Sequence, residues 1–134
     1  MSIYVDASAF LKRYFDEPDS AECERIMHAD PDWVTARHTR VEVRRNLARV
    51  LTGSGLAKVK AAFERDWARC NVVELDEVTC EVAATVAEGT GARTLDALHL
   101  GAAKRVADGT IGFLTYDVRQ ARAARALGWT VLGA

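Results

Sequence analysis

Two aspartates follow apolar segments that have the composition of buried strands. Asp6 comes directly after the β-branched and aromatic segment at residues 2–5, and Asp117 ends the segment at residues 113–117. Ligand sites of open parallel sheets form beyond the carboxyl ends of the strands. We therefore expect both side chains at one edge of a sheet, although each acid taken alone also fits a helix N-cap or a turn residue.

Two further acids interrupt apolar patterns on helices. Glu42 stands between two valines in an arginine-rich helix, and Asp96 stands between Leu95 and Ala97 in the first turn of another. A structural role is open for each. The helix dipole favours an acid in a first turn by about 0.3–1 kcal/mol, and a pair between Glu42 and Arg45 would contribute about 0.2–0.5 kcal/mol. No single one of the four acids therefore identifies a site.

The four acids indicate a specific chemistry if they converge. Two carboxylates about 4 Å apart repel by roughly 4 kcal/mol at an effective dielectric constant near 20, so a cluster of four needs a compensating charge. Carboxylate ligands without an accompanying His or Cys are typical of Mg²⁺ or Mn²⁺. Such a site activates water and stabilises the leaving oxygen of a phosphodiester. Convergence therefore predicts a nuclease that depends on Mg²⁺ or Mn²⁺.

The elements that must position these acids alternate between strand and helix. Short β-branched segments predict strands, and helical spacing of apolar residues predicts the helices between them. Residues 52–55 are expected to end one helix, and Thr94 is expected to cap another. The alternation predicts an α/β fold, a three-layer sandwich whose mostly parallel sheet is flanked by helices on both faces. The expected strands are residues 2–5, 33–35, 72–75, 111–115 and 130–132, and the expected helices are residues 7–14, 21–29, 37–51, 56–68, 78–88, 95–107 and an alanine-rich segment that ends at 127.

Length and composition are those of one globular domain. The chain has 134 residues, of which 49% are hydrophobic and 28% charged, and domains usually run to about 100–150 residues. We expect a single domain over residues 1–134. No apolar run approaches the roughly 20 residues that span a bilayer, and the start lacks the features of a signal peptide. We therefore expect a cytoplasmic protein with no membrane contact. The three cysteines show neither disulfide nor zinc spacing.

Positive charge is concentrated in the middle of a chain whose net charge is −1. Residues 35–70 carry nine basic and three acidic side chains, whereas residues 1–34 carry three and eight. A local basic patch can bind a polyanion because counterion release depends on the charges at the contact. The helix that carries Glu42 therefore offers contacts to a polyanion, and no base stacking along a single strand is expected because aromatic residues are not interleaved. Its arginines are Arg37, Arg40, Arg44, Arg45 and Arg49.

Four segments together resemble those of the PIN-domain ribonucleases, specifically the VapC-type toxins of toxin–antitoxin pairs. They are YVDAS at residues 4–8, TRVEVR at 39–44, RTLDALHL at 93–100 and LTYD at 114–117, in the family's order and approximate spacing. The resemblance runs the length of the chain. It implies a single PIN domain over residues 1–134 and an endoribonuclease that uses a divalent metal, as the toxin of a type II (VapBC-like) pair. It also implies a homodimer and inhibition by a cognate VapB-like antitoxin. The five arginines are expected to contact either the RNA backbone beside the acids or acidic residues of this antitoxin.

The resemblance implies a catalytic cluster that consists of Asp6, Glu42, Asp96 and Asp117. We expect the three aspartates to bind the metal directly and the glutamate to act through water, because its longer side chain reaches from a helix. Ser8 and Thr115 are expected as polar supports near the metal. His99 lies one turn beyond Asp96, where it either orients that acid or packs in the core.

Two positions depart from the family's pattern. Gly101 stands where alanine is more frequent, a packing change of little consequence for the chemistry. The residues that follow Asp117 are Val118, Arg119 and Gln120, without a further acid, which puts a second, weakly held metal in doubt.

Three alternative functions share some of these features. A receiver domain would need paired acids after the first strand and a lysine after the last one, and neither is present. A phosphatase that forms an aspartyl-phosphate would need an acid two residues after Asp6, where Ser8 stands. A PIN-like module that binds RNA or protein without cleaving stays open, although all four acids are present.

Overall fold

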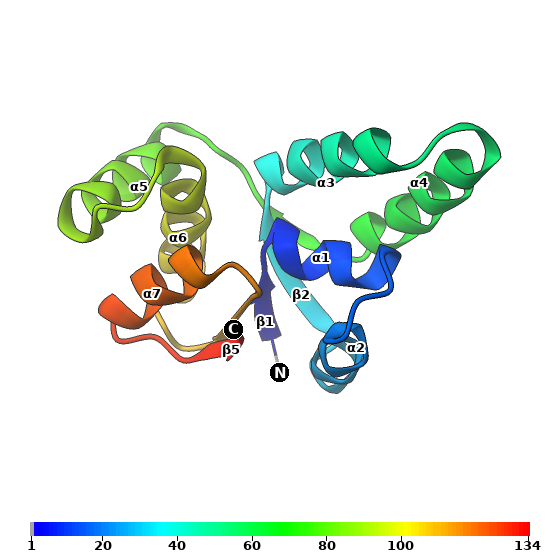
Figure 1. The fold of residues 1–134 in the computed structure, drawn as a ribbon. Coiled ribbons are helices and arrows are strands. Elements are labelled where there is room, and N and C mark those ends of the chain that lie inside the picture. Colours follow the sequence, from blue (N-terminus) through cyan, green and yellow to red (C-terminus); the bar gives the residue numbers. More distant parts are fainter. Residues whose placement is uncertain (1) are drawn as a thin grey trace.

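The computed structural model describes residues 2–134, and its centre is a five-stranded β-sheet in which every pair is parallel (Figure 1). The spatial order is β3-β2-β1-β4-β5. Val5 at the end of β1 is paired with Leu114 of β4, so the carboxyl ends of these neighbouring strands lie side by side. The strands are β1 (Ser2–Val5), β2 (Asp32–Ala36), β3 (Asn71–Val73), β4 (Gly112–Thr115) and β5 (Val131–Gly133).

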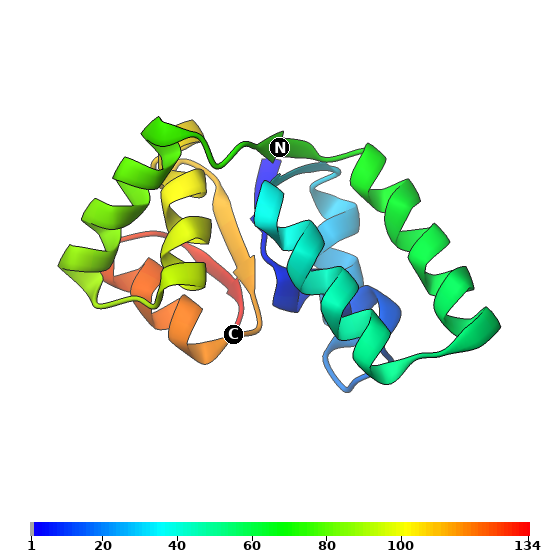
Figure 2. The ribbon, with the colours of Figure 1, turned by 90° about the horizontal axis from the view of Figure 1, so that it is seen from above.

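Helices cover both faces of this sheet. The first four lie on one side and the last three on the other, at the right and left of Figure 1, which confirms the predicted three-layer α/β fold. In Figure 2, α3 and α4 run side by side in opposite directions, as expected for a helical hairpin. The helices are α1 (Ala7–Tyr14), α2 (Ser20–Ala29), α3 (Arg37–Val50), α4 (Gly53–Ala68), α5 (Glu77–Thr90), α6 (Thr94–Val106) and α7 (Val118–Ala126).

Four helices begin earlier than predicted, α4 by three residues and α2, α5 and α6 by one residue each. Helix α4 begins at Gly53, because the N–H of Leu56 donates to the carbonyl of Thr52 at 3.2 Å and closes a first turn over the glycines. The cost of about 1 kcal/mol per glycine in a helix does not prevent this. At α6 the N-cap is Arg93, so Thr94 is the first helical residue rather than the cap. Strand β3 also ends earlier than expected.

Alternation along the strands divides the core between the two faces of the sheet. Successive side chains of a strand point to opposite faces, so Ile3 and Val5 pack towards α1–α4 while Tyr4 packs towards α5–α7. Helices α5 and α6 approach closely at Gly101, where an added Cβ would lie 2.7 Å from the backbone of Ala83. Glycine at this position therefore follows from helix packing. Among residues 2–134, no helix is both long enough and apolar enough to cross a membrane.

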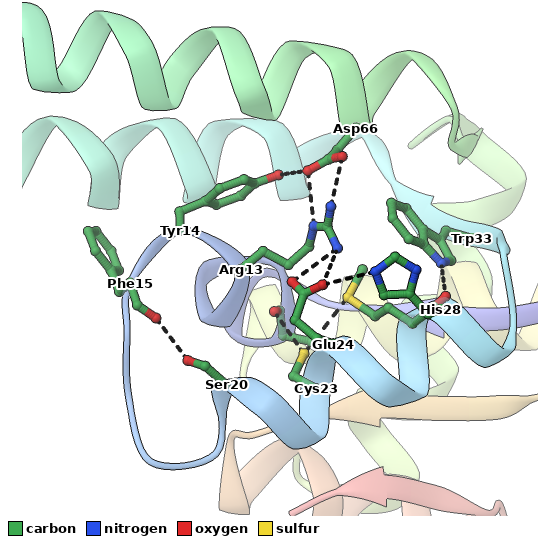
Figure 3. Close-up of polar contacts among 11 residues, drawn as sticks. Arg13, Tyr14, Phe15, Ser20, Cys23, Glu24, His28, Trp33 and Asp66 are labelled. Atoms are coloured by element: carbon green, nitrogen blue, oxygen red, sulfur yellow. Dashed lines mark hydrogen bonds and ion pairs between the residues drawn. The ribbon is translucent and has the colours of Figure 1, made fainter.

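A polar network joins α1 to α4 beside the core (Figure 3). The guanidinium of Arg13 donates to both carboxylate oxygens of Asp66, at 3.0 and 3.1 Å, and also to Glu24 at 3.1 Å. The hydroxyl of Tyr14 donates to Asp66 at 2.5 Å. Asp66 is only 8% exposed, so its negative charge is compensated by these donors and not by water.

Replacing Asp66 with alanine is expected to lower the free energy of unfolding by about 3 kcal/mol, because removal of one partner leaves the charge of Arg13 poorly compensated near the core. Chemical denaturation monitored by circular dichroism measures the change. Glu24→Ala is the matched control, since it removes a half-exposed partner of the same guanidinium and should cost less than about 1 kcal/mol. Equal losses in the two variants would contradict the assignment.

Candidate metal centre

One cavity of about 170 Å³ is lined by all four acids that the sequence singles out. Asp6 follows β1, Asp117 follows β4, Glu42 lies on α3, and Asp96 lies in the first turn of α6. The fold therefore brings together carboxylates that are far apart along the chain. The polar residues that complete the wall are Ser8, Asn46 and His99.

Asp6 is the most tightly held of the four. It is 3% exposed and forms the N-cap of α1, where its Oδ1 accepts a hydrogen bond from the N–H of Ala9 at 3.1 Å. The hydroxyl of Ser8 donates to the same oxygen at 2.6 Å, and the hydroxyl of Thr115 donates to Oδ2 at 2.5 Å. Three donors thus fix the orientation of one buried carboxylate.

Ser8 and Thr115 also connect the ends of β1 and β4. Their hydroxyl oxygens lie 3.2 Å apart. The Ser8 oxygen accepts from the N–H of Tyr116 at 2.9 Å, and the Thr115 oxygen accepts from the N–H of Asp117 at 3.1 Å. The two hydroxyls therefore position Asp6 directly and Asp117 through its backbone.

Asp117 and Asp96 are more accessible than Asp6. Oδ1 of Asp117 accepts from the N–H groups of Arg119 at 2.8 Å and Gln120 at 3.3 Å, so this exposed acid is the N-cap of α7 and also faces the cavity. Asp96 is partly buried, and within residues 2–134 its carboxylate accepts no hydrogen bond. Oxygens of both residues are therefore available to a ligand.

Glu42 is held by a histidine and not by the arginine that its spacing suggests. Its Oε1 lies 2.7 Å from Nε2 of His99, whose Nδ1 lies 2.7 Å from the hydroxyl of Tyr4. Within residues 2–134, the pair with Arg45 that the spacing allows is not formed, and His99 does not bond to Asp96. Because Tyr4 and His99 are buried, they form a rigid polar chain that ends at Glu42.

His38 packs against the ring of His99, with the two ring centroids 4.1 Å apart. Its Nε2 lies 3.2 Å from the carbonyl oxygen of Leu95 and 3.7 Å from Oε1 of Glu42. Burial lowers the pKa values of His38 and His99 to about 4 each, and each is lowered although nearby carboxylates oppose the shift. Both imidazoles are therefore neutral near pH 7. Tyr4 and His38 were not expected in the site from the sequence, because neither lies in a pattern that marks polar partners.

The electrostatics of the cavity disfavour ionised carboxylates. Burial raises the pKa of Asp6, against the opposing effects of His99 and the two hydroxyls. Burial also raises the pKa of Glu42, to which the charge of Asp117 adds. For Asp96 the causes of a raised pKa are burial, then the charges of Asp117 and Glu42. A cation in the cavity would offset this cost.

The donor set fits a hard divalent cation. The cavity offers carboxylate oxygens from four residues, which is the chemistry preferred by Mg²⁺ and Mn²⁺. Among residues 2–134, His38, Glu42 and His99 are the one group of at least three His, Cys, Asp or Glu side chains whose ligand atoms all lie within 4.8 Å of one another, and no three of the four acids are that close. The closest pair of this group, however, already shares a hydrogen bond. The free oxygens of Asp96 and Asp117 therefore favour the all-oxygen set.

Two of the five arginines predicted to contact RNA or a protein partner are paired within the chain. Arg37 donates twice to Glu74, and Arg40 pairs with Glu64 at 2.8 Å. Arg44 and Arg45 line a groove of about 420 Å³ on α3 and α4, while Arg49 is exposed outside it. The basic helix thus offers fewer free charges than its sequence suggests.

Comparisons with known proteins support one family. A sequence model described as PIN domain matches residues 3–126. The chain is 31% identical to Ribonuclease VapC46 of Mycobacterium tuberculosis over 98% of this chain and 96% of that protein. Its fold is similar to that of Mycobacterium tuberculosis VapC20, a Sarcin-Ricin loop cleaving toxin, with TM-score 0.69 at 16% identity over 98% and 99% of the two chains. It is also similar to a chain of a toxin–antitoxin complex from Klebsiella pneumoniae, with TM-score 0.69 at 12% identity over 88% of each chain.

Neutralising one wall of the cavity should stabilise the metal-free protein. We expect Asp96→Asn to raise its unfolding free energy by about 1 kcal/mol after solvent screening is counted, or its Tm by about 3 °C. In wild type, millimolar Mg²⁺ should raise Tm, and the variant should lose most of that rise. Thermal unfolding with EDTA and with Mg²⁺ measures both effects. Asp16→Asn on an exposed loop is the control, and identical behaviour of the two variants would exclude a repulsive cluster.

Stability should fall with acidification because of the buried His38. Its lowered pKa means that the unfolded chain binds the proton first, so stability is lost as pH falls from about 6.5 to about 4. The contribution is up to about 3 kcal/mol at 1.36 kcal/mol per pKa unit. In chemical denaturation at several pH values, the unfolding free energy of His38→Gln should fall less than that of wild type as the pH is lowered from about 6.5 to about 4. His28→Gln, at an exposed histidine, should match wild type. A wild-type pH dependence in His38→Gln would show that His38 is not the cause of the acid destabilisation.

Proposed function

Because this chain belongs to the PIN domain family and, within it, to the VapC group, we propose that it is the toxin of a type II toxin–antitoxin pair and hydrolyses RNA phosphodiester bonds. The observation that carries this proposal is the convergence of Asp6, Glu42, Asp96 and Asp117 on one cavity. We take residues 1–134 as a single PIN domain.

Asp6, Asp96 and Asp117 would hold Mg²⁺ or Mn²⁺. A divalent ion bound by these oxygens supplies Lewis-acid stabilisation of the negative charge that develops on a phosphodiester. The residues divide the work of positioning it. Asp6 is fixed by three donors, and Asp117 is fixed at the start of α7 with one oxygen left over. Asp96 supplies a carboxylate with no competing hydrogen bond from the described part of the chain.

Glu42 is suited to accept a proton from the attacking water. Its pKa is raised by burial, and a general base works best when its pKa approaches the working pH. The hydrogen bond from Nε2 of neutral His99 holds one of its oxygens at 2.7 Å, which leaves the other oxygen for water. Tyr4 fixes the imidazole from behind at 2.7 Å. Glu42 then acts through water and not as a direct metal ligand.

The groove on α3 and α4 is the proposed contact for an antitoxin. Arg44, Arg45 and Lys60 surround Val41, a hydrophobic side chain that is 68% exposed. An antitoxin segment with acidic residues around an apolar one would match this surface. The similarity to a chain of a toxin–antitoxin complex supports such a partner, and we propose a homodimer as the assembly that the antitoxin inhibits.

The catalytic assignment predicts metal-dependent RNA cleavage that Asp117→Asn lowers by about 100-fold or more, because it removes an accessible charge from the cation site. Purified protein is incubated with a defined set of RNAs in Mg²⁺, in Mn²⁺ and in EDTA. Asp6→Asn should lose activity to a similar extent, and circular dichroism checks that its buried site still folds.

Asp16→Asn is the control for an aspartate outside the cavity and should cleave at the wild-type rate. Undiminished cleavage by Asp117→Asn, or by wild type in EDTA, would overturn the assignment. RNA binding without cleavage under all metal conditions would identify the chain as a PIN-like binding module instead.

A further inference from the structure

A second cavity adjoins the acidic one and is basic. It has a volume of about 420 Å³ and lies where the end of α5 and the start of α6 face α7. Asp96 lines both cavities, so the two are neighbours across one side chain. Three arginines contribute to its wall, and we call it the arginine cavity; they are Arg93, Arg119 and Arg122.

These three arginines have no partners among the described residues, in contrast to the four arginines that are held in ion pairs. Arg13, Arg37, Arg40 and Arg105 each pair with a carboxylate. Within the part of the chain that the structure describes, the guanidinium groups of the arginine cavity donate no hydrogen bond and form no ion pair. Like charges that converge in this way repel one another, so the cavity is suited to an anion.

The position of the arginine cavity relative to the acids limits the identity of this anion. Arg93 and Arg119 lie near enough to Asp96 to oppose the rise of its pKa. A cation site and an arginine site that share Asp96 would meet neighbouring points of one extended ligand. A polyanion with regularly spaced phosphates has charges to place at both.

We propose that the arginine cavity binds a phosphate of the RNA strand adjacent to the linkage held at the acidic cavity. This inference rests on the proposed function. Guanidinium groups match phosphate oxygens in bidentate geometry. The remaining wall is made of small or short residues and presents no aromatic or large aliphatic anchor among residues 2–134, whereas protein partners usually bury such anchors. The chemistry therefore favours a nucleic acid backbone over an acidic peptide.

The test measures RNA affinity under conditions that prevent cleavage. A short single-stranded RNA is titrated with the full chain in EDTA over a range of salt concentrations, followed by fluorescence anisotropy. We expect Arg93→Gln/Arg122→Gln to weaken binding about tenfold at low salt and to reduce the slope of log K against log salt by about 0.7 for each phosphate that is no longer neutralised. The control Arg25→Gln/Arg65→Gln makes the same charge change at exposed arginines outside the cavity and should leave the slope unchanged.

A chemical probe locates the bound phosphate on the RNA. Neutral methylphosphonate replaces one linkage at a time in the same RNA. In wild type, one position near the cleaved linkage should lose affinity about as much as the double variant does. In the double variant that position should weaken no further, because the two changes remove the same interaction.

Kinetics with Mg²⁺ separate binding from chemistry. The double variant should raise KM and leave kcat near wild type, because its arginines do not touch the reacting atoms in this assignment. Equal salt slopes for the double variant and its control, or additive losses with every methylphosphonate, would overturn the proposal. The proposal would also be overturned if the double variant kept wild-type RNA affinity but no longer bound an acidic peptide that wild type binds. If RNA binds to the wild-type protein as described but is never cleaved, the proposed function is refuted while the proposed phosphate site remains supported.

Discussion

The gathering of four carboxylates around about 170 Å³ is the constraint on which the rest of the site depends. Repulsion among these carboxylates opposes their ionisation unless it is compensated, and burial adds to this cost for Asp6, Glu42 and Asp96, whose pKa values are all raised. The fold meets the cost locally with hydrogen-bond donors, most densely at Asp6. A divalent cation bound at the proposed site would offset the remaining cost, so in this proposal the instability of the metal-free site and its affinity for metal have one origin.

The parallel sheet makes this gathering possible. Because β1 and β4 are neighbours in register, Asp6 and Asp117 leave the sheet at one edge, and the N–H of Asp6 still donates to Leu114 of β4 at 3.3 Å. Both acids then cap helices, so their orientation comes from backbone N–H groups without the need for extra residues. Helices α3 and α6 approach from opposite faces of the sheet and bring Glu42 and Asp96 to the same edge.

Charge on the surface is arranged around this centre in separate groups. Two arginines of α3 are paired with Glu74 and Glu64, and two of the unpaired ones, Arg44 and Arg45, line a groove that contains an exposed valine. Those of the arginine cavity have no such partners among the described residues and adjoin Asp96. One region is therefore suited to a protein with an apolar segment and the other to a phosphate backbone, and inhibition by a partner and binding of RNA need not use the same side chains.

Local patterns in the amino-acid sequence predicted the succession of strands and helices and the acids at strand ends, because apolar periodicity and short-range turn chemistry are local properties. The α/β class followed from them, most element boundaries followed to within one residue, and the four acids could be named. Which side chains meet could be learned only from the packing of the folded chain. That Glu42 bonds to His99 and not to Arg45, that Asp66 holds Arg13, and that Arg93 and Arg122 share a cavity depend on contacts between distant segments. Such contacts are set by how the helices pack on the sheet, which no local pattern encodes.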